Sequence, residues 1–233
     1  MERLDKLLAA TGRWSRKECR ELVRAGRVTV NGEKAGRPEE KCPPDAEITV
    51  DGQAVSCGGF FYLMLHKPAG VLSATEDVRQ RTVLDLLPAH LRRVGLFPVG
   101  RLDKDTEGLL LLTNDGPLAH ELLAPKKHVD KTYFVRVEGA LDQADAAAFA
   151  AGMVLEDGTA CLSAGLQLLE RADEGIVTLR EGKYHQIKRM LAARGKPVCY
   201  LKRLSMGPLC LDEALGPGQW RELTAQERRA LGR

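Results

Sequence analysis

A charged loop that leads directly into an apolar run constrains the fold of this chain more than any other part of its sequence. Residues 100–108 read GRLDKDTEG, and four leucines, Leu109 to Leu112, follow without a break. An uninterrupted apolar run closed by Thr113 and an Asn-Asp-Gly sequence predicts a buried strand that ends in a turn. The loop therefore carries a carboxylate, which we expect to be Asp103, at the edge of a rigid sheet, where catalytic groups are well held.

The length and composition are those of a globular protein. The 233 residues can form one large domain or a small and a medium one, and 44% of them are hydrophobic and 29% charged. The opening sequence MERLDK lacks the apolar run of a secretion signal, and no stretch approaches the roughly 18 to 20 apolar residues of a membrane span. We therefore expect a cytoplasmic protein. The six cysteines are scattered without a Cys-x-x-Cys pair, which indicates reduced thiols and no zinc site.

Positive charge is concentrated in two segments of the chain. Residues 1–27 contain eight basic and four acidic residues, a net charge of +4, whereas residues 28–58 contain three and six, a net charge of −3. Residues 181–205 contain seven basic residues and one acid, a net charge of +6. Two positive segments in a chain whose overall charge is only +3 predict a polyanionic partner, although solvated helix faces would give the same pattern.

The first 58 residues are expected to form a separate module. Leucines at helical spacing predict a short amphipathic helix over residues 4–12. The sequence SRKE at 15–18 is a capping box that starts a second helix, and Gly26 closes that helix. Two short strands, 27–30 and 48–50, are each followed by an Asn-Gly or Asp-Gly turn. The pattern predicts two helices followed by a small sheet.

The amino-acid sequence of this module resembles that of the small RNA-binding domain shared by a ribosomal small-subunit protein, tyrosyl-tRNA synthetases and several rRNA-modifying enzymes. The resemblance rests on RLDKLL at 3–8, SRKE at 15–18 and GRVTVNG at 26–32. Such a domain binds RNA backbone and shape through basic side chains. We expect this role for four residues of the second helix, namely Arg16, Lys17, Arg20 and Arg24. The linker-like sequence Cys57-Gly58-Gly59 then separates a domain of residues 1–58 from one of residues 59–233.

The second domain is predicted to be α+β. Strands are expected at 60–65, 109–113, 131–137 and 176–179, and they are joined by only occasional helices. One helix covers the alanine-rich segment 142–151, and a second, in the segment 181–191, buries Ile187, Met190 and Leu191. No dinucleotide-binding, P-loop or nucleophile-elbow motif occurs.

Four motifs of this domain resemble, in the same order, those of the RsuA family of pseudouridine synthases. They are HKPAG at 66–70, GRLD at 100–103 with Thr106 and Gly108, KTY at 131–133 and GKYHQIKRM at 182–190. The match covers about residues 59–223, and the preceding RNA-binding module belongs to the same architecture. The resemblance implies an isomerase with a mixed, mainly antiparallel sheet that converts a uridine of ribosomal RNA to pseudouridine.

The resemblance also implies roles for three catalytic residues. Asp103 is the nucleophile of a covalent mechanism, and Lys188 is the cation that pairs with it and favours its ionised form. Tyr133 stacks on the flipped uracil, and its hydroxyl can help to move the C5 proton. The reaction involves no redox change or net hydrolysis, so no metal or organic cofactor is expected. Attack on the ribose C1′ and attack on the uracil ring both remain open.

Three further basic residues are expected to act on RNA. Arg101 occupies the position that fills the space left by an extruded base in related enzymes, although a phosphate contact would also explain it. Lys183 and Arg189 are expected to contact phosphates.

The remaining polar residues of the motifs have lesser expected roles. We expect Asp105 and Glu107 to be solvated or to cap the loop, and Thr106 to shape it by local hydrogen bonding. His185 and Gln186 belong to the last motif, but no catalytic step is assigned to them.

The sequence favours small-subunit (16S) rRNA as the substrate. The segment after 220–224 lacks the basic extension found on some large-subunit relatives, and Leu123-Ala124-Pro125 followed by KTY is more similar to the small-subunit enzyme. The partner is therefore expected to be this RNA, free or in an assembling ribosomal subunit. Two alternatives are a large-subunit (23S) rRNA target and a non-catalytic RNA-binding assembly factor, and the intact catalytic motifs argue against the second.

Overall fold

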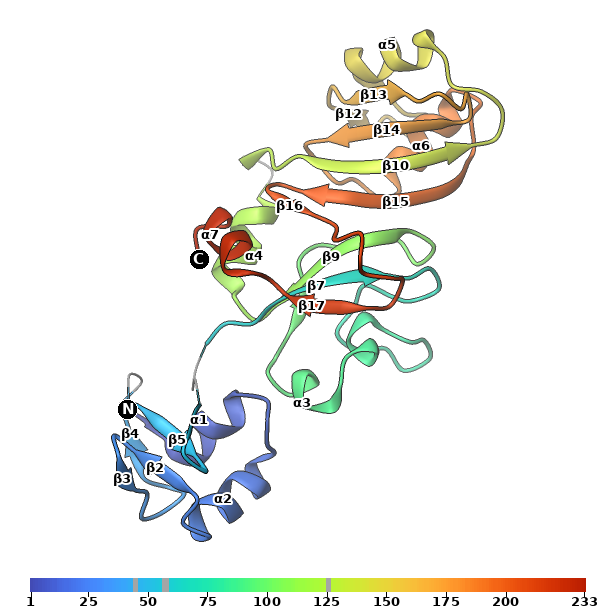
Figure 1. Ribbon diagram of the computed structural model, residues 1–233. Coiled ribbons are helices and arrows are strands. Elements are labelled where there is room, and N and C mark those ends of the chain that lie inside the picture. The colour runs from blue at the N-terminus through green and yellow to red at the C-terminus, as the bar shows by residue number, and fades with distance from the viewer. Residues whose placement is uncertain (44–45, 56–58, 125–126) are drawn as a thin grey trace. The chain divides into compact units, whose positions relative to one another are not determined.

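The computed structural model describes residues 1–43, 46–55, 59–124 and 127–233 (Figure 1). The chain forms two units: Met1–Phe61 with Leu84–Phe97, and Tyr62–Val83 with Pro98–Arg233. The first unit thus includes a segment, 84–97, that follows the predicted linker in sequence. The linker itself, at 56–58, lies outside the described residues. None of the helices described is long and apolar enough to cross a membrane.

Two short helices and a small sheet form the N-terminal module. The helices are α1, Leu4–Ala10, and α2, Arg16–Arg24. The Ser15 hydroxyl accepts the Glu18 N–H, and the Glu18 carboxylate accepts the Ser15 N–H, which confirms the capping box. The antiparallel sheet has the order β3–β2–β5–β6, and a separate antiparallel pair joins β1 to β4. These strands are β1 Glu2–Arg3, β2 Val28–Val30, β3 Glu33–Lys34, β4 Lys41–Cys42, β5 Ile48–Val50 and β6 Gln53–Val55.

The module has its own apolar core and the predicted turns. Leu4 and Leu8 of α1 pack with Cys19 and Val23 of α2 against the sheet. Both turns, Asn31-Gly32 and Asp51-Gly52, have the positive φ angles that favour these residue types. Local sequence patterns therefore account for this part of the fold.

The second unit is built on one mixed sheet of order β13–β14–β10–β15–β9–β7–β17, with β16 paired to β15. Strands β9 and β15 run parallel, and the other pairs along this order are antiparallel. The strands of this part of the chain are β7 Tyr62–Lys67, β8 Phe97–Pro98, β9 Glu107–Thr113, β10 Lys131–Val137, β13 Gly165–Leu168, β14 Glu174–Leu179, β15 Val198–Met206, β16 Leu209–Cys210 and β17 Trp220–Glu222. A further short pair joins β11, Met153–Val154, to β12, Ala160–Cys161. The predicted α+β class with a mainly antiparallel sheet is confirmed.

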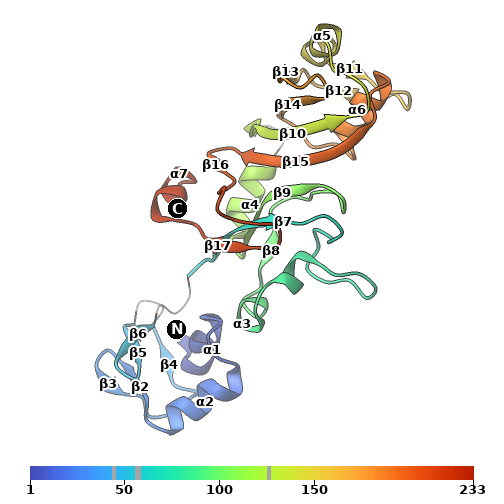
Figure 2. The same ribbon diagram turned by 45° about the vertical axis from the view of Figure 1, so that its right-hand side comes forward.

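Helices cover parts of this sheet. Helices α5, Gln143–Ala151, and α6, Gln186–Ala193, share a core with strands β10, β14 and β15. The predicted inward residues Ile187, Met190 and Leu191 are all in that core. Figure 2 shows α4 and α7 beside the β9–β7–β17 part of the sheet. The bounds of these two helices are α4 Gly116–Leu123 and α7 Ala225–Ala230. Helix α3, Ala89–Arg92, and the 3₁₀ helix η1, Val83–Leu86, apart from Val83, belong to the first unit.

Two predicted elements are corrected by the structure. The Asn-Asp-Gly sequence does not simply close strand β9, because Asp115 is the N-cap of α4 and accepts the Leu118 N–H at 2.9 Å. Aspartate favours turns and helix N-caps alike, so the local pattern could not decide between them. Strand β7 runs over 62–67 instead of 60–65, which places His66 and Lys67 inside the sheet.

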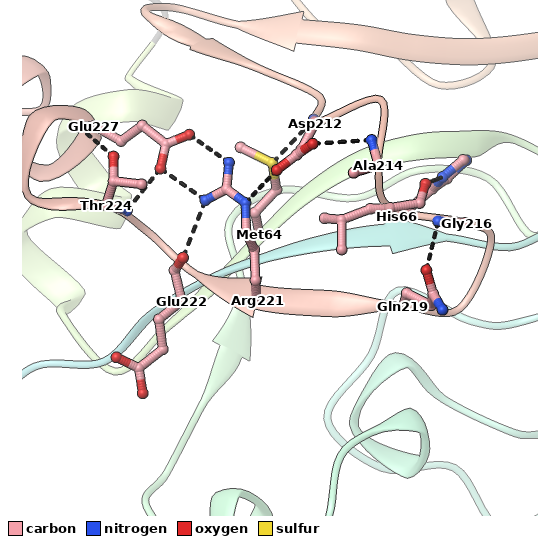
Figure 3. A network of polar contacts seen from close by, with 11 residues as sticks. Met64, His66, Asp212, Ala214, Gly216, Gln219, Arg221, Glu222, Thr224 and Glu227 are labelled. Atoms are coloured by element: carbon pink, nitrogen blue, oxygen red, sulfur yellow. Dashed lines mark hydrogen bonds and ion pairs between the residues drawn. The ribbon is translucent and has the colours of Figure 1, made fainter.

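Arg221 of β17 joins the C-terminal segment to the edge of this sheet (Figure 3). Its guanidinium binds both carboxylate oxygens of Glu227 in α7 at 2.8 Å and one oxygen of Asp212 at 2.6 Å. Arg221 and the Thr224 cap hold the pKa of Glu227 at about 2, below its ordinary value of 4.5. Because β17 pairs with β7, this network supports the strand that carries Lys67.

Candidate active site

The predicted catalytic loop leads into a deeply buried strand of the sheet. Leu109 to Leu112 of β9 have no exposed surface, and β9 lies between β7 and β15. Gly108 has a φ of 103°, and a Cβ at this position would lie 2.2 Å from the Arg203 carbonyl oxygen. Only glycine permits the close approach of β9 to β15 at the base of the loop.

A cavity beside this loop brings together the three predicted catalytic residues. Asp103 comes from the loop, Tyr133 from β10 and Lys188 from α6, and all three line the cavity. The predicted RNA-binding residues Arg101 and Lys183 also line it. Residues separated by up to 87 positions therefore meet at one site, as the motif order implied.

Lys188 is shared between two carboxylates of the loop. Its Nζ lies 3.2 Å from Asp103 Oδ2 and 2.5 Å from Asp105 Oδ1. Asp105 was expected to be solvated or to act as a cap, and its side chain is indeed 74% exposed, but it is the nearer partner of the ammonium. The hydrogen bond from Lys188 lowers the pKa of Asp105. The loop thus presents two acids to one cation, and only Asp103 lines the cavity with it.

Glu107 also has a partner that the sequence did not reveal. The Tyr200 hydroxyl donates to Glu107 Oε2 at 2.8 Å, which is a contact between β15 and β9. The carboxylate is neither simply solvated nor a cap.

Thr106 shapes the loop through its backbone instead of its side chain. Its N–H donates to the Asp103 carbonyl at 3.1 Å. The hydroxyl is buried and has no hydrogen-bond partner in the described part of the chain. The predicted side-chain hydrogen bond is therefore not made.

Lys67 is a loop-holding residue that the sequence did not identify. The side chain is fully buried, and its ammonium donates to the carbonyls of Pro68, Lys104 and Thr106 at 2.9 to 3.1 Å. Burial lowers the pKa of Lys67 to about 8. Two of the three carbonyls, those of Lys104 and Thr106, belong to the residues on either side of Asp105. Lys67 therefore holds the loop against strand β7. The signal in the sequence was a lysine two residues after the apolar run YLML, at a position where a continued strand would bury it.

The turn before α6 positions His185 at the mouth of the cavity. His185 has a φ of 48°, an uncommon angle for a residue other than glycine. Its ring stacks on Tyr184 with centroids 3.8 Å apart, and its Nε2 lies 3.5 Å from Asp103 Oδ1. Gln186 bridges this turn, because it accepts the Lys183 N–H at 3.0 Å and donates to Glu181 at 2.6 Å. The structure thus places His185 next to Asp103, whereas Gln186 orders the backbone.

The other predicted RNA-binding residues lie in different environments. Arg189 pairs with Asp157 at 2.6 Å and is absent from the residues that line the cavity. In the N-terminal module Arg20 binds the buried carboxylate of Asp5 at 3.1 Å, so it stabilises the module itself. The remaining three are exposed, namely Arg16, Lys17 and Arg24.

The arrangement contains the groups that covalent catalysis by a carboxylate requires. A carboxylate, a cation at 3.2 Å and an aromatic hydroxyl share one cavity, and such groups can serve as a nucleophile, its counter-ion and a group that stacks and transfers a proton. Within the described residues no cluster of three or more His, Cys, Asp or Glu side chains could hold a metal ion.

Comparisons with known proteins show what the chain as a whole is similar to. Residues 61–193 match the family model for RNA pseudouridylate synthases, and residues 2–55 match the S4 domain. The chain is 51% identical to an RNA pseudouridine synthase of Bacillus subtilis, over 98% of both chains. It is 39% identical to the ribosomal small subunit pseudouridine synthase A of Pseudomonas aeruginosa, over 97% of this chain and 98% of the relative. A crystal structure of a pseudouridylate synthase superposes with a TM-score of 0.71 at 33% identity and covers 99% of this chain and all of the other.

Proposed function

Because the chain belongs to the RsuA family of RNA pseudouridine synthases, we propose that it isomerises one uridine of small-subunit rRNA with Asp103 as the nucleophile. The observation that carries this proposal is the placement of Asp103 at the cavity, 3.2 Å from Lys188 and together with Tyr133. The rRNA target is supported by the Pseudomonas aeruginosa relative, whose name specifies the small ribosomal subunit.

The proposed reaction exchanges one bond of the nucleotide for another. The N1–C1′ glycosidic bond breaks and a C5–C1′ bond forms, while C5 loses a proton and N1 gains one. Asp103 forms the transient covalent bond, and the Lys188 ammonium stabilises its carboxylate before attack and after release. Tyr133 stacks on the base and transfers the C5 proton.

RNA must be opened before this chemistry can begin. The target base is extruded from its stack, and Arg101, which is exposed at the cavity, occupies the vacated space. The N-terminal module adds backbone contacts through its exposed Arg16, Lys17 and Arg24. We place the enzyme in the cytoplasm, on rRNA that is free or part of an assembling subunit.

Tritium release from rRNA labelled at uridine C5 tests the role of Asp103. Asp103→Asn should abolish release and retain RNA binding, because the amide keeps the shape of the side chain but is not a nucleophile. Asp105→Asn in the same loop should retain measurable release, and Glu76→Gln, an exposed carboxylate elsewhere in the unit, serves as the neutral control. Release by the Asp103→Asn protein at the wild-type rate would remove Asp103 from the mechanism.

The substrate is tested separately by mapping carbodiimide adducts on both rRNAs of a deletion strain. We expect one small-subunit uridine to lose its modification. Loss confined to the large-subunit rRNA would contradict the proposed target while leaving the chemistry intact.

A further inference from the structure

A second cavity of about 360 Å³ adjoins the catalytic cavity and shares part of its wall. Arg101, Tyr133, Gly182 and Lys183 line both. The second cavity is strongly cationic, since Glu181 is the one acid among the described residues that line it. Five of those residues are basic, namely Arg101, Lys131, Arg180, Lys183 and Arg203.

Arg203 is the central feature of this cavity. It lies on β15 directly opposite Tyr133 of β10, so the two side chains share one face of the sheet. Only 2% of Arg203 is exposed, and its Nε donates to the Leu109 carbonyl at 2.7 Å. Its Nη2 is buried without a hydrogen-bond partner, and no carboxylate of the described residues forms a salt bridge with it. A buried cation in this state is costly until an anion or other acceptor reaches it.

Lys131 adds a second cation that forms no salt bridge in the described part of the chain. It lies two residues before Tyr133 on β10 and hence on the same face of the strand. Burial and the nearby Arg203 both lower the pKa of Lys131, and its ammonium donates only to the Val129 carbonyl at 3.2 Å. By contrast Arg180 pairs with Asp130 at 2.9 Å, and Lys183 lies 3.5 Å from Glu181. Arg101, Lys131 and Arg203 form no salt bridge in the described part of the chain, and of these three only Lys131 and Arg203 are half-buried or buried.

We infer that this cavity binds a phosphate group, with Arg203 and Lys131 as its principal ligands. The planar guanidinium matches phosphate oxygens, and a second cation in the same cavity suits a multiply charged anion. The volume greatly exceeds the roughly 30 Å³ of one water molecule. Since the cavity shares Tyr133 with the catalytic one, the phosphate is that of the RNA backbone next to the flipped uridine, an identification that rests on the proposed function.

Calorimetric titration of the full-length protein with uridine 3′,5′-bisphosphate, uridine and inorganic phosphate tests the inference. The bisphosphate should bind at least tenfold more tightly than uridine. Lys131→Gln should weaken bisphosphate binding about tenfold or more and leave uridine binding unchanged. Lys202→Gln removes the same charge from the neighbouring strand position, which points to the other face, and it should bind the bisphosphate like the wild type.

Arg203→Lys provides a second variant, to be used where circular dichroism shows that it folds. It keeps the charge but loses the planar fork, and it should weaken bisphosphate binding as well. Equal affinities of Lys131→Gln and wild type, or equal losses in Lys131→Gln and Lys202→Gln, would overturn the site. Inorganic phosphate that binds with the same variant dependence but is not displaced by RNA would show that the anion is not the RNA backbone. These titrations require no catalysis, so their failure is distinguishable from failure of the proposed reaction.

Discussion

Replacing Lys67 by methionine should loosen the catalytic loop without touching the cavity. The ammonium donates three hydrogen bonds, to the carbonyls of Pro68, Lys104 and Thr106. Hydrogen bonds from a charged donor contribute about 1.5 to 3 kcal/mol each, so their loss costs about 5 to 9 kcal/mol. Methionine fills similar space but donates to none of the three carbonyls, and of these only the Lys104 carbonyl keeps a hydrogen bond in the described structure, from the Gly70 N–H at 2.8 Å.

An opposing effect reduces this loss. Burial lowers the pKa of Lys67 from 10.5 to about 8, which at about 1.4 kcal/mol per pKa unit corresponds to roughly 3 kcal/mol spent on keeping the buried amine charged. Methionine does not incur that cost. The free energy of unfolding of the second unit should therefore fall by about 2 to 6 kcal/mol.

The pH dependence of the wild type follows from the same lysine. Its folded pKa lies below the unfolded value, so the penalty for the charged amine is present below about pH 8 and is relieved as the pH rises toward 10.5. A neutral amine has two N–H groups for three carbonyls. The loop is then held less firmly, and we expect kcat of the wild type to decline as the pH rises through about 8.

Two measurements check this reasoning. Urea unfolding is followed by Trp220 fluorescence in a Trp14→Phe background, because Trp220 lies in the second unit with Lys67. Tritium release gives kcat and KM. In Lys67→Met the fold-decrease in kcat should be larger than the fold-change in KM. Lys104→Met removes the same charge from an exposed position of the loop and should retain wild-type stability. If Lys67→Met and Lys104→Met had the same free energy of unfolding and the same kcat, the proposed role of Lys67 in holding the loop would be refuted.

Two further predictions concern parts of the chain outside the cavity. The pKa of Glu227 is lowered from 4.5 to about 2, so its contribution is present above about pH 4.5 and lost as the pH falls toward 2. Glu227→Gln should cost about 1 to 3 kcal/mol of unfolding free energy at pH 7, and a wild-type-minus-variant difference that stays constant down to pH 2.5 would contradict this. In the N-terminal module, replacing Arg16, Lys17 and Arg24 together by glutamine should reduce the slope of log binding constant against log salt by up to about 3. The same slope in filter-binding assays of wild type and variant would exclude these residues from phosphate contact.

Local sequence patterns were sufficient where a feature depends on neighbouring residues. The capping box at Ser15 and the buried run Leu109 to Leu112 occur as predicted. The meeting of Asp103, Tyr133 and Lys188 was also predictable, but only through a resemblance to a family, because no local pattern brings such distant residues together.

Features that depend on distant partners could not be predicted. A buried lysine needs hydrogen-bond acceptors, and two carbonyls 37 and 39 positions away accept hydrogen bonds from the Lys67 ammonium. From the sequence Asp105 is expected to be a solvated acid. In the structure α6 places Lys188, 83 positions away in sequence, within hydrogen-bond distance of it. Arg203 appeared as one of seven basic residues in a charged segment, and only the parallel pairing of β15 with β9 buries it.

The arrangement of charge around the loop explains why a second set of cations is needed. Asp103 and Asp105 carry two negative charges toward an RNA backbone that is itself negative, and Lys188 offsets only one of them. Binding at the cavity would be repulsive unless cations nearby bind the phosphates. Arg203 meets this need and also holds the Leu109 carbonyl at the base of the loop. In the proposed site, the side chain that binds the phosphate is therefore also the one that donates to strand β9 directly after the loop of Asp103.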